Sequence, residues 1–129
     1  MKETTIRVLK VEPNNVPCMA RLNNDLDSLQ KAVSIGSEHQ GLIEIIDIAE
    51  NVAILCNEEG KLIGFEGNRR LGNDIIVGVF YVVGTDDEGN LCSLTDEQMA
   101  YYNNVFFTPE TITQDEIGDS IVFEFIDLP

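Results

Sequence analysis

Residues 75–84 read Ile-Ile-Val-Gly-Val-Phe-Tyr-Val-Val-Gly, and this stretch decides the fold. β-Branched and aromatic residues fill it, and these are the residue types that strands favour. A polar, glycine-containing connection at residues 67–74 precedes it, and the turn sequence Asp86-Asp87-Glu88-Gly89-Asn90 follows it. The sequence therefore predicts one strand from Ile75 to Gly84, bounded by a loop and a hairpin turn.

The chain after this strand contains the signature of a capped helix. Thr95-Asp96-Glu97-Gln98 matches a capping box, in which the threonine hydroxyl and the glutamine side chain satisfy the first free N–H groups. We expect a helix from about Asp96 to Phe106, ended before Pro109, with Tyr102 and Phe106 packed in the core. Ser120 to Ile126 is predicted to be the last strand, with Ile121, Phe123 and Phe125 on one face.

The chain before residue 75 contains further strand patterns and one helical pattern. We expect strands at residues 4–11, 41–48 and 52–56, then a hairpin turn at residues 57–61 with Gly60 at positive φ and a return strand at 62–65. An apolar stripe at helical spacing predicts an amphipathic helix that contains Leu22, Leu26, Leu29 and Val33. The predicted fold is α+β: a single domain over residues 1–129, with a mostly antiparallel sheet of about five to seven strands packed by two helices.

The charge of the chain is distributed unevenly. The 129 residues hold 23 acids against 8 Lys and Arg, a formal net charge of -15, and no Lys or Arg follows Arg70. Direct contact of the second half with a nucleic-acid backbone is therefore disfavoured, because phosphate contacts need cations. Two interpretations remain open: a solvated acidic surface that aids solubility, or a face that attracts a basic partner. The candidates for such a face are Asp86, Asp87, Glu88, Asp96 and Glu97.

Asn68-Arg69-Arg70 is the second candidate site. Two adjacent guanidinium groups between glycines could hold a phosphate or carboxylate of a ligand such as a nucleotide. The alternative is an internal role, in which an arginine pairs with a carboxylate of the protein and Asn68 caps the turn. The sequence does not distinguish these two roles.

Candidate residues for catalysis or metal binding are few. His39 is the single histidine, and Cys18, Cys56 and Cys92 lie far apart without a Cys-x-x-Cys pair. We interpret Cys56 and Cys92 as inert core residues, and the Asp86–Asn90 turn as a hairpin rather than a calcium loop. No cofactor, metal site or enzymatic activity is therefore expected. The absence of a signal-peptide pattern and of a membrane-length apolar run predicts a cytoplasmic protein.

Several motifs resemble the domain-of-unknown-function family numbered 3846. They are Arg7-Val8-Leu9-Lys10-Val11-Glu12-Pro13, Leu26-x-x-Leu29-Gln30, Asn57-Glu58-Glu59-Gly60-Lys61-Leu62, Asn68-Arg69 and Asp74-Ile75-Ile76-x-Gly78. The segment from Val33 to Gly41 departs from the family pattern and implies a longer loop. The resemblance implies an association with phages and mobile elements of bacteria, and hence a small accessory protein that acts on host machinery or on the upkeep of the element. Together with the charge distribution, this predicts a protein of the bacterial host cell that binds a host macromolecule, with a protein of basic surface favoured as the partner.

Overall fold

A computed structural model of the chain describes the backbone of residues 3–126 and the side chains of residues 3–120. Its main element is an antiparallel sheet with strand order β2-β1-β7-β4-β3, in which β8 also pairs with β7. The six strands are β1 (Thr5–Val11), β2 (Cys18–Asn23), β3 (Ile43–Ala49), β4 (Val52–Asn57), β7 (Phe80–Thr85) and β8 (Leu91–Cys92). The α+β class and the mostly antiparallel sheet are therefore confirmed.

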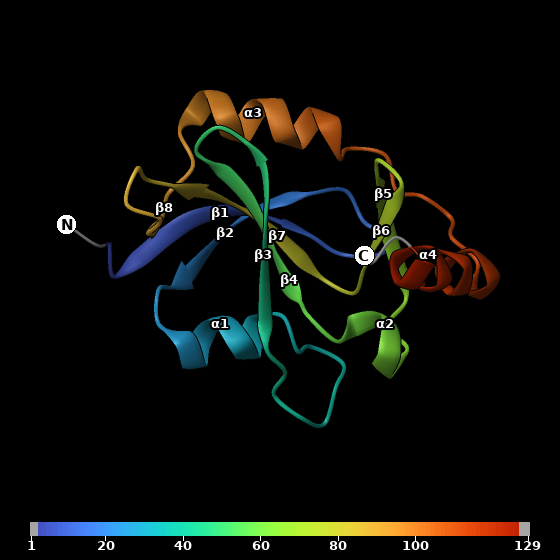
Figure 1. Cartoon of the computed structure of the whole chain (residues 1–129). Helices are drawn as coiled ribbons and strands as arrows, with labels where there is room; N and C mark the ends of the chain where they lie inside the picture. Colours follow the sequence, from blue (N-terminus) through green and yellow to red (C-terminus); the bar gives the residue numbers. More distant parts are fainter. Residues whose placement is uncertain (1–2, 127–129) are drawn as a thin grey trace.

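One helix covers each face of this sheet, so the molecule has three layers (Figure 1). The helices are α1 (Leu26–Ala32) and α3 (Asp96–Val105). The core against α1 contains Val8, Leu29, Val33, Leu55 and Tyr81, among other residues. The core against α3 contains Leu9, Ile54, Phe80, Tyr102 and Phe106, among other residues. Because β1, β7 and β4 have a helix-covered core on both sides, apolar residues fill both of their faces.

The capped helix of the sequence prediction is confirmed as α3. The Gln98 N–H donates to the Thr95 hydroxyl over 3.1 Å, and the Thr95 N–H donates to the Gln98 side chain over 2.9 Å. Tyr102 and Phe106, one helical turn apart, both lie in the core below the helix. The prediction for these two aromatic residues is therefore also correct.

The prediction of one strand over residues 75–84 is wrong, because the chain changes sheet at Gly78. Residues before it form β6 (Asp74–Val77), which pairs with β5 (Gly67–Leu71) in a separate two-stranded sheet. Gly78 has φ +68°, and its N–H donates to the Glu66 carbonyl over 2.7 Å. A left-handed residue here turns the chain from the small sheet into β7, so residues 67–74 are mostly strand rather than a polar loop.

Four further predictions of local structure are wrong. Residues 57–61 do not form a hairpin turn, and residues 62–65 are not a return strand, because α2 (Gly60–Ile63) follows β4. Gly64 rather than Gly60 takes a positive φ. The Asn57 side chain starts this turn by accepting from the Glu59 N–H over 2.8 Å. Leu22 belongs to β2 and not to the first helix.

The predicted last strand is a helix, α4 (Gln114–Ile126). The Glu116 N–H donates to the Thr113 hydroxyl over 3.1 Å, which caps the first turn. Ile117 then packs with Ile75 and Val77, so α4 covers the small sheet. The described residues thus contain four helices rather than two, and α2, α4 and the β5–β6 hairpin lie together at one end of the large sheet (Figure 1).

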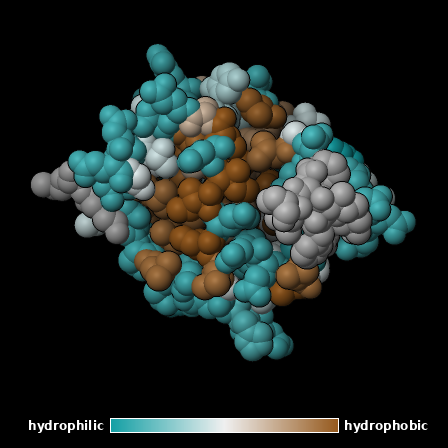
Figure 2. Space-filling model, in the orientation of Figure 1, coloured by the Kyte–Doolittle hydropathy of each residue, from teal (hydrophilic) through white to brown (hydrophobic). Residues whose placement is uncertain are grey.

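The surface in front of β3 is more apolar than its surroundings (Figure 2). Ile45 on this strand is 46% exposed and Leu42 just before it is 54% exposed, although β4 beside them is buried throughout. Among the described residues, no helix is long and apolar enough to cross a membrane.

Replacing Gly78 with Ala is expected to lower the free energy of unfolding by about 2 kcal/mol or more. The new methyl group would lie 2.7 Å from the Phe65 ring, in addition to the cost of the left-handed backbone. Gly72→Ala is the matched control, because Gly72 also has positive φ but no atom within 4 Å of the added Cβ. The control should lose only about 1 kcal/mol in urea denaturation, and equal losses for the two variants would contradict the packing argument.

Candidate functional site

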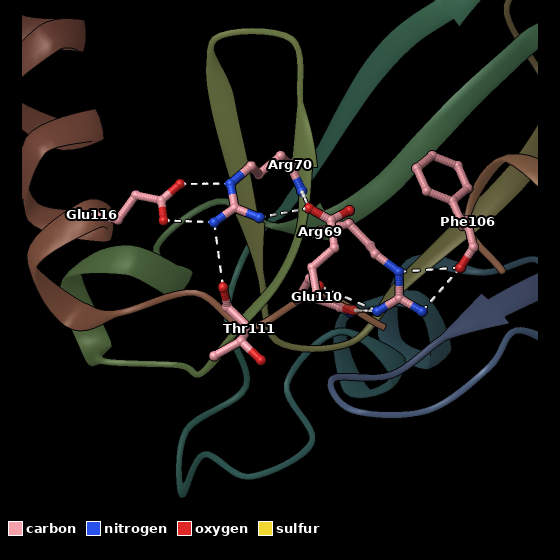
Figure 3. A network of polar contacts seen from close by, with 7 residues as sticks. Arg69, Arg70, Phe106, Glu110, Thr111 and Glu116 are labelled. Carbon is pink, nitrogen blue, oxygen red and sulfur yellow. Dashed lines mark hydrogen bonds and ion pairs between the residues drawn. The ribbon is translucent and has the colours of Figure 1, made fainter. Parts of the chain in front are cut away.

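Arg69 lies on β5 and points into the protein, where its side chain is fully buried. Its Nε and Nη2 donate to the Phe106 carbonyl over 3.1 and 2.9 Å (Figure 3). Nη2 also donates to the Asn15 carbonyl over 2.7 Å. Nη1 donates to the backbone and side-chain oxygens of Asn68. The guanidinium group therefore joins β5, the β1–β2 turn and the end of α3.

The position of Phe106 explains how a cation is held here. Phe106 is the C-cap of α3, and the free carbonyl groups at a helix C-terminus carry a partial negative charge. Burial lowers the pKa of Arg69, and the nearby charge of Glu110 opposes this effect. Carbonyl dipoles and the helix end thus compensate for the loss of water around the guanidinium group.

Asn68 completes this arrangement, since it is also fully buried. Its amide nitrogen donates to the Val11 carbonyl over 2.9 Å and to the Gly78 carbonyl over 2.7 Å. Its side-chain oxygen accepts from Arg69 over 2.7 Å. We call Asn68, Arg69 and their carbonyl partners at Val11, Asn15, Gly78 and Phe106 the arginine clamp.

Arg70 points to the opposite side of β5 and contacts the segment that leads into α4 (Figure 3). Nε and Nη2 each donate to the Glu116 carboxylate over 2.7 Å, and Nη1 donates to Glu110 over 2.9 Å. The two carboxylates raise the pKa of Arg70, and Arg70 lowers the pKa of Glu116. The side chains of Asn68, Arg69 and Arg70 are thus all engaged within the protein, and the two arginines do not face a common ligand site.

The predicted acidic residues do not all share one role. The Asp86 carboxylate accepts from the backbone N–H groups of Glu88 and Asn90, which lowers the pKa of Asp86 and orders the turn. Asp96 forms an ion pair with Arg7. Glu88 is exposed in the turn, and Asp87 and Glu97 are exposed near two surface hollows.

These two hollows bring three of the predicted acids together with Asp47 and Glu50, which sequence reasoning missed. The first is lined by Asp47, Glu50, Asp86 and Asp87, together with Ile45 and neighbouring residues. The second shares Glu50 and adds Glu97 and Tyr101, which is 63% exposed. No Lys or Arg lines either hollow. We call the surface formed by Asp47, Glu50, Asp86, Asp87, Glu97 and Tyr101 the acidic end.

Ala49 and Glu50 line both hollows, and Glu50 follows β3 in the turn to β4. The side-chain amide nitrogen of Asn51 donates to the Thr85 carbonyl over 2.8 Å, which holds this turn beside the end of β7. In the sequence, the only signal of this turn is Glu50-Asn51 between two apolar runs. Strand order determines which residues lie beside Glu50 in space, and the sequence does not reveal that order.

A third hollow of about 250 Å³ lies between β3, α2 and β6. It contains Lys61 in an ion pair with Asp74, and the Cys56 thiol lies 3.8 Å from the Glu44 carboxylate. Burial and the charge of Glu44 raise the pKa of Cys56 to about 12. This thiol is therefore protonated at neutral pH, as expected of a core cysteine rather than a nucleophile.

The remaining candidate residues do not form a centre. His39 is exposed between α1 and β3, Cys18 is exposed on β2 and Cys92 is half-buried on β8. Among the described residues, no group of three or more His, Cys, Asp or Glu side chains is placed to hold a metal ion.

Removing the buried guanidinium group is expected to destabilise the protein strongly. Arg69→Met should lower the free energy of unfolding by about 3 kcal/mol, because it leaves buried carbonyl groups without donors. Arg69→Lys should lose about 2 kcal/mol, since an ammonium group cannot reach all of these carbonyls. Urea denaturation measures both losses, with the exposed Arg70→Met as control. A larger loss for Arg70→Met than for Arg69→Met would contradict the clamp.

The raised pKa of Cys56 predicts a large difference in thiol reactivity. At about pH 8, iodoacetamide should modify the exposed Cys18 at least about a hundredfold faster than Cys56 in the native protein. Peptide mapping by mass spectrometry over time gives both rates. In urea the two rates should become similar, and rapid native labelling of Cys56 would contradict its burial.

Comparison with known proteins places this architecture in a family. No curated protein and no solved structure matches the chain. A family model described as "Domain of unknown function (DUF3846)" matches residues 6–107, which run from β1 to the end of α3 and contain the whole arginine clamp. Because this match covers more than half of the 129 residues, the chain belongs to the DUF3846 family.

Proposed function

We propose that this protein is a non-enzymatic binding protein whose acidic end binds a basic surface of a macromolecular partner. The observation that carries the proposal is the convergence of five carboxylates on two adjoining hollows without a lining cation. The side chains are Asp47, Glu50, Asp86, Asp87 and Glu97. Like charges this close repel one another, so an incoming Lys or Arg relieves repulsion as well as forming ion pairs.

Tyr101 gives the acidic end an apolar contact as well as charge. It is 63% exposed on α3, and its ring lies edge-on to that of the buried Tyr102 at a centroid distance of 4.9 Å. A rigid aromatic side chain is a common anchor of protein interfaces. Charge around such an anchor speeds encounter with a basic partner and adds specificity.

The partner we propose is a protein of the bacterial host. The association with phages and mobile elements implied by the resemblance favours an accessory protein that acts on host machinery. Binding through one acidic surface would act stoichiometrically, by covering the basic surface of that host protein in the cytoplasm. A nucleic acid does not suit the acidic end, because phosphates and carboxylates repel.

The alternative function, nucleotide binding by Asn68, Arg69 and Arg70, has less support. Arg69 is fully buried, and its donors are directed at carbonyl groups of the protein. Arg70 is held by Glu110 and Glu116. An anion would have to displace these partners before it could bind. We therefore favour the acidic end.

Neutralising the acidic end should weaken partner binding by about tenfold, because each lost surface ion pair contributes a few tenths to one kcal/mol. The variant is Glu50→Gln/Asp87→Asn/Glu97→Gln. The matched control, Glu38→Gln/Glu59→Gln/Asp119→Asn, removes the same number and type of charges at exposed positions elsewhere. Host-lysate proteins retained at low salt and released at high salt are quantified by mass spectrometry for both variants.

The control variant should capture these proteins as the native chain does. Equal loss of captured protein in the two variants would mean that net charge, and not the acidic end, determines binding. Capture that does not change between low and high salt would contradict the proposed function, because surface ion pairs are screened by salt.

A further inference from the structure

The outer edge of β3 has no strand beside it among the described residues. The sheet order ends at β3, which pairs with β4 on its other side. The Glu58 N–H donates to the Leu42 carbonyl over 2.9 Å, so Leu42 and Glu58 form a hydrogen-bonded pair of the β3–β4 ladder. Because hydrogen bonding alternates along an antiparallel pair, Ile43, Ile45 and Asp47 direct their N–H and C=O groups away from β4. These groups form an open row of donors and acceptors.

This edge has only part of the protection that usually prevents strand addition. Natural sheet edges are protected by charged side chains, especially lysine, and by proline, bulges or very short strands. The charged side chains of residues 43–47 are Glu44 and Asp47, both of them acidic. Residues 43–47 pair with β4 in continuous register and contain no Lys or Pro, and the bulge comes only after Asp47. The opposite edge, β2, carries Arg21 and starts directly after Pro17. The two edges of the sheet are therefore protected to different degrees.

Most of the side chains around this open row are apolar. Figure 2 shows an apolar area in front of β3, surrounded by hydrophilic residues. Ile43, Ile46 and Ile48 are partly buried, and Ile45 and Leu42 are 46% and 54% exposed. An added strand would cover these residues and would satisfy the open backbone groups at the same time.

Charge decides which kind of strand fits. Ile45 and Asp47 line the same hollow as Glu50, Asp86 and Asp87, so the edge leads directly into the acidic end. A second copy of the chain would bring its own Asp47 and Glu50 to this place, at a formal net charge of -15 for each chain. A strand that carries Lys or Arg at one end meets no such repulsion.

We propose that β3 is a strand-addition site that pairs with an extended, basic segment of a partner protein. The segment places apolar side chains along Ile43 and Ile45, and Lys or Arg beside Asp47 and the acidic end. This inference rests on the proposed function and extends it, because it names the form and sequence character of the partner. Backbone pairing supplies affinity, and the carboxylates select basic segments and set their position.

The test uses a labelled peptide, acetyl-Thr-Val-Thr-Val-Lys-Val-Lys-amide, and fluorescence anisotropy with the full chain. Ile45→Pro should weaken binding at least about tenfold, because the ring removes an outward donor and blocks the edge. It costs no bond to β4, since the Ile45 N–H points away from that strand. Ile45→Thr keeps the donor and the β-branched shape, so it should change binding by no more than about threefold.

Two peptide controls separate backbone pairing from charge. Methylating alternate backbone nitrogens of the peptide keeps its charge but removes donors, and should abolish binding to the native chain. This arm is decisive even where Ile45→Pro does not fold. Glutamate in place of both lysines should also abolish binding. Undiminished binding of either control peptide overturns the proposal.

Hydrogen exchange locates the added strand. In the free protein the amides of Ile43, Ile45 and Asp47 should exchange faster than those of Glu44 and Ile46. The basic peptide should protect the first three amides. Protection elsewhere with none on β3 overturns the proposal.

The outcomes also separate this inference from the proposed function. If neutralising Glu50, Asp87 and Glu97 weakens peptide binding while Ile45→Pro does not, the acidic end binds basic segments without strand addition. If neither variant weakens it, both proposals fail. A concentration-dependent dimer in analytical ultracentrifugation that Ile45→Pro dissociates would assign the edge to a second copy and overturn the proposal.

Discussion

The burial of the Arg69 guanidinium group is the constraint on which the arrangement of the other elements depends. A buried cation needs compensation, and here it comes from carbonyl groups of the β1–β2 turn, of Asn68 and of the α3 C-cap. Each of these groups must stay in place for the charge to be tolerated. The clamp therefore fixes the small sheet and the end of α3 against the turn that joins β1 and β2.

Because the clamp fixes the C-terminus of α3, it also determines where the acidic side chains at the N-terminus of this helix lie. Asp96 and Glu97 lie in its first turn, where acids complement the helix dipole. Arg7 neutralises Asp96, whereas Glu97 lines the hollow that contains Tyr101. One helix thus uses a cation at its buried end and presents an acid at its exposed end.

Throughout the described part of the chain, most cations are paired within the protein, whereas many carboxylates are exposed. Six of its seven Lys and Arg side chains have an internal partner: Arg7, Lys10, Lys31, Lys61, Arg69 and Arg70. The cations are thus largely committed to internal contacts. A surplus of carboxylates is left for the surface, and the strand order gathers several of them where the β3–β4 and β7–β8 turns meet.

Local patterns predicted local structure well and contacts between distant segments poorly. The Thr95–Gln98 capping box predicted α3, and the apolar runs predicted β1, β3 and β4. Ser120 to Ile126 alternates like a strand, but the cap at Thr113 and the packing of Ile117 favour a helix. Sequence reasoning found the acidic turn and the start of α3, but only strand order brings Glu50 of the β3–β4 turn beside both of them.

The arginine pair shows the same limit at a candidate site. The sequence identified Arg69 and Arg70 as unusual but could not assign their partners, which lie up to 54 residues away in the chain. Adjacent residues on a strand point to opposite faces, so one arginine enters the core and the other reaches α4. Because of this alternation, Arg69 and Arg70 cannot bind one anion together as long as β5 remains a strand.

The two arginines also differ in whether their partners lie within the residues that the family model matches. Arg69 and all of its acceptors lie within residues 6–107, whereas Glu110, Thr111 and Glu116, which hold Arg70, lie outside this range. The clamp, the β3 edge and the acidic end all belong to the matched part. Helix α4 packs through Ile117 on the small sheet, at the opposite end from the β3–β4 turn (Figure 1). The surface proposed to bind a partner is therefore built by the matched residues and does not require α4.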